Sequence, residues 1–167
     1  MKIRLVRAIA VILTVIILMQ TVCAVSGVPY TDVTSDRWSY SSVKTLYDLG
    51  VFPQSDTLRP AETETRGNFV MYLYLLAQRL GANAGGSYQV PFTDVSADGP
   101  WYEACAWAYH NNIVKGVNAT AFSPQSHIMR QDVCVIMLRF IRYLKLSVSK
   151  AEDASLFVDS FKVSGYA

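Results

Sequence analysis

The sequence predicts an all-α protein built from tandem helix–loop–helix units. One series of short motifs occurs twice along the 167 residues and begins a third time near the end. A series of motifs that recurs at a nearly fixed spacing is typical of repeat architectures. In both full copies, apolar residues recur at helical spacing. With 51% apolar and 17% charged residues, the chain is also expected to bury a core rather than remain disordered.

The motifs divide the chain into units. Each copy opens with an aromatic residue and, two positions later, an aspartate: Tyr30 and Asp32, Phe92 and Asp94, Phe157 and Asp159. We interpret the aspartates mainly as turn residues whose carboxylates accept backbone N–H groups. The pattern predicts unit 1 at residues 29–81, a linker at 82–90, unit 2 at 91–146 and a truncated unit 3 at 156–167.

The N-terminal 24 residues read as a secretory signal peptide. Lys2, Arg4 and Arg7 precede an apolar run, and Val22-Cys23-Ala24 fits a cleavage site after Ala24. A membrane anchor would need roughly 18 apolar residues, but the polar pair at 20–21 ends the run too early. A lipoprotein signal using Cys23 would require small residues before it, and these are missing. We therefore expect a secreted protein with no stable membrane span after cleavage.

Charge and residue types exclude several functions. Without the first 24 residues, 12 basic residues stand against 13 acidic ones, a net of −1. Such a chain lacks the clustered basic face of a nucleic-acid-binding protein. The cysteine and histidine spacings do not match a zinc site, and no catalytic set or phosphate-binding loop is found. We expect no metal, no cofactor and no enzymatic activity.

The mature chain keeps Cys105 and Cys134, both within apolar helical patterns. We expect both to be buried free thiols, which behave as small hydrophobic residues. An oxidising compartment would also allow a disulfide.

The first helix of each unit carries a tryptophan. In unit 1, Ser35 or Asp36 is expected to cap the helix of Trp38, and Gly50 to end it in a left-handed turn. In unit 2, Pro100 suits the first helical position, followed by Trp101. A core position is the commoner use of such a tryptophan, and stacking on a ligand is the alternative.

A proline-containing loop and a second helix follow. Arg59-Pro60 and Ser123-Pro124 lie 64 residues apart, and proline favours an extended residue before it. Expected caps are Thr63 or Thr65 in unit 1, and Ser126 or His127 in unit 2. The apolar stripes of these helices comprise Phe69, Leu73, Leu76 and Leu80, ended by Gly81, and Val133, Ile136, Met137, Phe140, Ile141 and Leu144.

Each second helix has an arginine in its first turn, Arg66 and Arg130. A cation there opposes the helix dipole, at a cost of roughly 0.3–1 kcal/mol. An anionic ligand held by free N–H groups and the guanidinium would reverse this effect. A solvated arginine paired with Glu64 or Asp132 explains the placement equally well.

Taken together, the motifs resemble the S-layer homology repeat of secreted bacterial surface proteins. The resemblance covers about residues 29–167 and rests on the aromatic-x-Asp-Val opening, the tryptophan, the Gly116 loop, Phe122-x-Pro124 and a helix start similar to Thr-Arg-Ala-Glu. It implies a pseudo-threefold helical bundle of three repeats, incomplete here. Grooves between such repeats hold secondary cell wall polysaccharide, often pyruvylated, which anchors the protein noncovalently at the wall or S-layer surface.

The resemblance also implies site residues. Arg66 and Arg130 match the motif arginine, Thr65 its threonine and Asp132 its glutamate, while Trp38, Trp101 and Gly116 match groove positions. The motifs depart from the family pattern, with Asn68 for glutamate and Met129 for threonine. These departures favour an alternative, in which the repeats make protein–protein contacts at the surface without binding glycan. The incomplete third repeat also suggests association with another chain to complete the bundle.

Overall fold

The structure is a computed structural model that describes residues 27–147 and 162–166. These residues form the helices α2 (Tyr40–Asp48), α3 (Arg66–Arg79), α4 (Tyr102–His110) and α5 (Arg130–Tyr143). Over the same ranges, the sole β-type pairing is an isolated bridge between Thr65 and His127. The all-α prediction is therefore confirmed. The predicted signal peptide and most of unit 3 lie outside the described residues.

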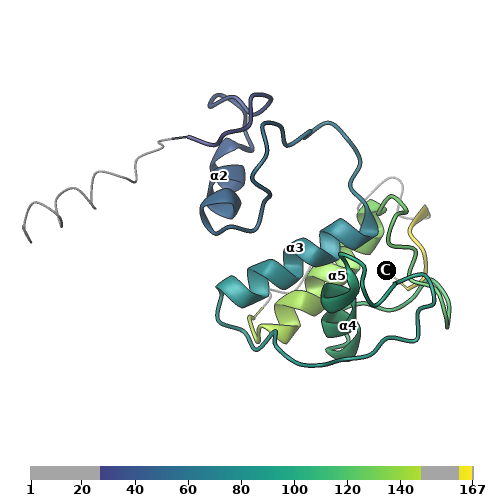
Figure 1. Cartoon of the computed structure of the whole chain (residues 1–167). Helices are drawn as coiled ribbons and strands as arrows, with labels where there is room; N and C mark the ends of the chain where they lie inside the picture. The colour runs from purple at the N-terminus through teal and green to yellow at the C-terminus, as the bar shows by residue number, and fades with distance from the viewer. Residues whose placement is uncertain (1–26, 148–161, 167) are drawn as a thin grey trace, which may run out of the picture.

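The main core joins helices from both predicted units. Helices α3, α4 and α5 gather in one group (Figure 1), and their buried side chains form one cluster. Its largest fully buried members are Trp107, Phe122, Phe140, Ile113 and Val70. Packing of α3 from unit 1 against both helices of unit 2 hides apolar surface that a single two-helix unit would leave in water.

Helix α2 belongs to a second, smaller cluster. Tyr30, Val33 and Val43 are buried there, on the N-terminal side of the structure (Figure 1). An edge-to-face contact between Phe52 and Tyr72, with ring centroids 5.3 Å apart, connects this part to α3. In the part of the chain described here, no helix is long and apolar enough to cross a membrane.

The unit-opening aspartates within the described residues, Asp32 and Asp94, accept backbone N–H groups as predicted, but the donors lie in a loop 26–29 residues further along the chain rather than nearby. Asp32 accepts hydrogen bonds from the backbone N–H groups of Leu58 and Arg59, at 2.9 and 2.7 Å. Asp94 binds the N–H groups of Phe122 and Ser123 in the same way. Each carboxylate therefore ties the start of its unit to the loop before the second helix.

These bonds also correct the predicted conformation of the proline loops. Arg59 and Ser123 are not extended but have φ values of 57° and 59°. The aspartate carboxylate receives two successive N–H groups, which fixes a tight turn, and this outweighs the preference that a following proline imposes. The residue before the proline therefore has a positive φ in both units.

The helix ends agree with the predictions in part. Thr65 caps α3, and its hydroxyl accepts the N–H of Asn68. Gly50 and Gly81 have φ values of 67° and 74° after their helices, as expected. At α5, however, the cap position falls on Met129 rather than on Ser126 or His127. His127 lies too early because its backbone pairs with Thr65 in the isolated bridge, and Ser126 lies in the bend before it.

The first helices begin later than predicted. Helix α2 starts after Ser39, so neither Ser35 nor Asp36 is its cap. Helix α4 starts after Trp101, which places Pro100 in the preceding turn. Both tryptophans therefore lie at the entrance to their helices rather than within them.

Three burial predictions are wrong. Leu80 is 55% exposed, because the buried face of α3 runs through Val70, Leu73 and Ala77 instead. Trp38 is 90% exposed and is not a core residue. Cys134 is exposed, whereas Cys105 is buried as expected, and both are free thiols. Burial raises the pKa of Cys105 to about 12, so this thiol stays protonated at neutral pH.

Candidate functional site

A hollow of about 390 Å³ opens beside the start of α3, bounded by α5 and the loop after α4. It brings together three predicted site residues, Arg66, Gly116 and Asp132. Three further polar residues, which no sequence motif had indicated as site residues, also line it: Lys115, Arg139 and Tyr166. Residues separated by up to 100 positions in the sequence thus meet at one place.

Arg66 is held firmly at the base of this hollow. Its side chain is only 11% exposed. One guanidinium nitrogen donates to the carbonyl of Lys115 at 2.9 Å, and the other lies 3.6 Å from Asp132 Oδ2. The guanidinium carbon also sits 4.8 Å from the centre of the Phe122 ring, a cation–π contact. Arg66 is therefore paired with Asp132, as one prediction had it, but it is buried rather than solvated.

The N-terminus of α3 does not present free N–H groups to a ligand. The N–H groups of Arg66 and Gly67 donate to the carbonyls of Ser126 and Pro124, at 2.9 and 2.8 Å. The next N–H group is capped by Thr65. The expected convergence of helix N–H groups on an anion therefore does not hold at α3. Ligand attraction here has to come from side chains.

The side chains of the hollow give it a positive charge. Arg66, Lys115 and Arg139 contribute three cations, and Asp132 contributes one carboxylate. Burial lowers the pKa of Arg66, while the nearby Asp132 raises it. Arginine keeps its proton at any physiological pH. A partly enclosed site with this excess of cations favours an anionic ligand.

Gly116 lines the hollow at a position that has no room for a side chain. A Cβ atom there would lie 2.3 Å from the carbonyl oxygen of Asn118 and 2.6 Å from a Phe92 ring carbon. The tight loop holds the carbonyl of the preceding Lys115 where Arg66 can bind it. The role of Gly116 is thus to shape the loop that positions Arg66.

Thr65 and Trp101 lie next to the hollow but have structural contacts. Thr65 caps α3. The Trp101 ring packs against Gly67, and its Nε1 donates to Asn68 Oδ1 at 2.9 Å. The asparagine that replaces the family glutamate is therefore the acceptor for this indole.

Arg130 and Trp38 do not join the other predicted site residues. Arg130 is exposed and does not line the hollow. Among the described residues, its side chain has no hydrogen bond or ion pair. Trp38 lies in the part of the chain that contains α2 and is 90% exposed. The two motif arginines thus have different environments, although their sequence contexts are alike.

Residue Tyr166 repeats the contact of Trp101 one unit later. Its hydroxyl donates to Asp132 Oδ1 at 2.7 Å and accepts from Gln131 Nε2 at 2.8 Å. Asp132 lies 64 positions after Asn68, the acceptor of the Trp101 indole. The aromatic residue of one unit thus binds the first turn of the second helix in the unit before it.

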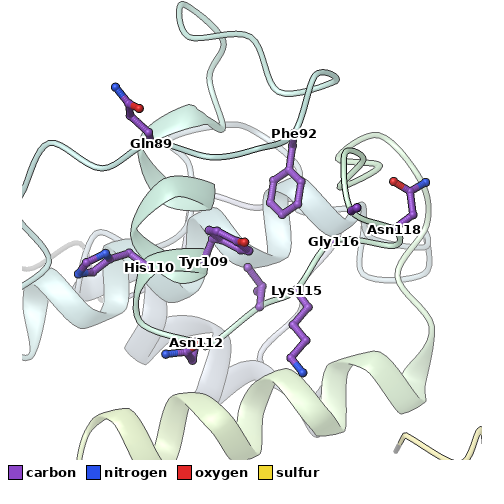
Figure 2. Close-up of a pocket in the computed structure, with 10 residues that line it drawn as sticks. Gln89, Phe92, Tyr109, His110, Asn112, Lys115, Gly116 and Asn118 are labelled. Carbon is purple, nitrogen blue, oxygen red and sulfur yellow. The ribbon is translucent and has the colours of Figure 1, made fainter.

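A second hollow, of about 580 Å³, shares Lys115 and Gly116 with the first. Figure 2 shows the residues that line it, with the rings of Phe92 and Tyr109 close together in an edge-to-face contact. Tyr109 is 38% exposed. Asn112 and Asn118 add side-chain amides. No spacing rule in the sequence identifies these residues, because they meet only when α4 and the following loop fold back together.

Comparison with known protein families finds a match for part of this chain. A family model described as "S-layer homology domain" matches residues 91–134. This range contains α4, the Lys115–Gly116 loop and the first turn of α5, and hence half of the residues that line the hollow beside Arg66.

Two relatives match over most of the chain. An endoglucanase of Bacillus sp. (strain KSM-635) is 30% identical over 142 residues, which is 83% of this chain and 14% of that protein. The surface-layer 125 kDa protein of Lysinibacillus sphaericus is 29% identical over 133 residues, or 78% of this chain and 10% of that protein. The chain therefore spans only a small part of the length of either relative.

Proposed function

Because residues 91–134 of this chain match the S-layer homology domain, we propose that the protein attaches noncovalently to the bacterial wall by binding an anionic secondary wall polysaccharide. The family and the surface-layer relative support a role at the cell surface in general. The finer proposal is that the hollow beside Arg66 holds the acidic group of the polymer. In this function the chain is a secreted binding module and not an enzyme.

The excess of cations in the hollow is the observation that supports this function best. Arg66, Lys115 and Arg139 surround a space of about 390 Å³, large enough for a sugar residue. A carboxylate on the sugar, such as a pyruvate ketal, would replace water around these groups. It would also bring a second acceptor to Arg66, whose Nε is buried without a hydrogen-bond partner.

The second hollow provides a place for the neighbouring sugar. It adjoins the first across Lys115 and Gly116, so a linear polymer could pass over this loop. An exposed tyrosine ring beside side-chain amides suits a neutral sugar, which offers both an apolar face and hydroxyl groups. We therefore assign the acidic sugar to the Arg66 side and a neutral sugar to the Tyr109 side.

Co-sedimentation with purified Gram-positive walls tests this function. The protein should pellet with intact walls and stay in solution when the acid-labile secondary polymer has been removed. Lys115→Gln and Arg139→Gln together should weaken pelleting about tenfold or more, because two charged contacts to an anion are lost. Added salt should weaken binding of the unaltered protein as well.

Arg130→Gln is the matched control. It removes one exposed cation of the same motif but does not touch the hollow, so it should leave pelleting unchanged. Equal loss in the Arg130 variant would show that binding depends on overall charge and not on this site. Pelleting that survives removal of the polymer would contradict the proposed ligand.

A further inference from the structure

The aromatic residues at the start of the first helices dock in one common way, and within residues 27–147 and 162–166 Trp38 has no partner of this kind. Trp101 donates to Asn68 in α3, and Tyr166 donates to Asp132 in α5. In both cases the acceptor is the third residue of the helix and belongs to the preceding unit. Trp38 has the corresponding place in unit 1, yet it is 90% exposed.

The exposed indole needs a partner that resembles the first turn of α3 or α5. An indole buries a large apolar area when it docks, and its N–H group seeks an acceptor. At α3 this place is filled, because the Trp101 ring packs on Gly67. At α5 it is filled less completely, since Tyr166 remains 59% exposed and the adjacent Met129 54% exposed.

The first turn of α5 lacks a second contact that α3 has. The backbone N–H groups of Arg66 and Gly67 donate to carbonyls at residues 126 and 124 of the following unit. For the equivalent N–H groups of Arg130 and Gln131, no acceptor occurs within residues 27–147 and 162–166. Unit 1 carries the equivalent carbonyls at residues 62 and 60, 64 positions before the ones used at α3.

We propose that this chain self-associates head to tail, with unit 1 of one copy docking on the start of α5 of a second copy. Trp38 of the first copy takes the place of Tyr166 in the second, and its Nε1 donates to Asp132. The carbonyls near Pro60 accept the N–H groups at the start of α5. Since the two faces differ, a docked pair keeps one free face of each kind, and the association can extend or close into a ring.

This proposal does not depend on glycan binding. It assigns a function to the most exposed tryptophan and identifies its partner as a second copy of the same protein. Trp38 of a second copy can displace Tyr166 because an indole buries more apolar area than a phenol.

Sedimentation velocity of the purified protein over a range of concentrations tests the proposal. The unaltered protein should show concentration-dependent oligomers. Trp38→Ala should weaken association at least tenfold, and circular dichroism should be unchanged because the side chain is 90% exposed. Leu80→Ala, which also removes an exposed apolar side chain but at the far end of α3, should associate normally.

A complementation experiment tests the head-to-tail geometry. Gln131→Arg places a bulky cation on the acceptor face and should also abolish association. A mixture of the Trp38→Ala and Gln131→Arg proteins restores one intact pair of faces, so it should form dimers and nothing larger. A monomeric unaltered protein at every concentration, normal association of the Trp38 variant, or no dimer in the mixture would each overturn the proposal.

Discussion

Gly67 leaves an open surface at the start of α3 on which the Trp101 indole lies. A Cβ atom at this position would approach three ring carbons at 2.9 Å, closer than packed atoms tolerate. The ring would shift and lose the hydrogen bond to Asn68. Overpacking of this kind typically costs about 1–3 kcal/mol, and we expect a loss in that range for Gly67→Ala in denaturant unfolding.

Gly85→Ala provides the control for this prediction. The nearest atom to a Cβ at Gly85 is 4.0 Å away, so the added methyl group has room. Unfolding of this variant should match that of the unaltered protein. An equally stable Gly67→Ala protein would mean that the indole does not rest on α3 in solution.

At the scale of the element, both second helices end at a residue with positive φ. Gly81 follows α3 with φ 74°, and Lys145, 64 positions later, follows α5 with φ 57°. A Cβ at Gly81 would meet no atom within 4 Å, so Gly81→Ala should cost only the backbone strain of about 1–2 kcal/mol.

Introducing a glycine at the equivalent position after α5 should stabilise that helix. Lys145→Gly removes a side chain from the left-handed region, where glycine is favoured at a helix C-terminus. Thermal unfolding should show opposite shifts in the transition temperature for these two variants. Shifts of the same sign would contradict the assignment of both positions as left-handed caps.

At the scale of the whole molecule, the unit-opening aspartates make the free energy of unfolding depend on pH in the acid range. The N–H groups of Leu58 and Arg59 hold the pKa of Asp32 below its ordinary value. For Asp94, burial raises the pKa, but bonds from Phe122 and Ser123 outweigh it and the net shift is also downward. Their contribution to stability is therefore complete above the ordinary aspartate pKa of 3.8 and is lost as the pH falls through the lower folded values.

Denaturant unfolding between neutral pH and the acid range measures this effect. Asp94→Asn should lower stability at neutral pH and flatten the acid dependence, because an amide carries no charge and accepts at only one oxygen. Asp98→Asn, at an exposed position in the same loop, should change neither. An unaltered acid slope in the Asp94 variant would place the responsible carboxylate elsewhere.

The sequence alone determined the features that arise from local chemistry. The tandem repeats, the helical class, the Thr65 cap and the left-handed turns at Gly50 and Gly81 could all be predicted. These features depend on hydrogen bonds between residues that are close in sequence, and on the intrinsic preferences of glycine and threonine. The resemblance to the S-layer homology repeat also pointed to Arg66, Gly116 and Asp132, which the structure brings to one hollow.

Only the tertiary structure decided which motif residues act together. Arg66 and Arg130 have equivalent positions in sequence, but α5 and the loop after α4 enclose only Arg66. Trp38 and Trp101 look alike in sequence, yet only Trp101 has a preceding helix, α3, on which to pack. Burial depends on the neighbour that each unit finds, and these contacts between units lie beyond what periodicity within a unit can determine.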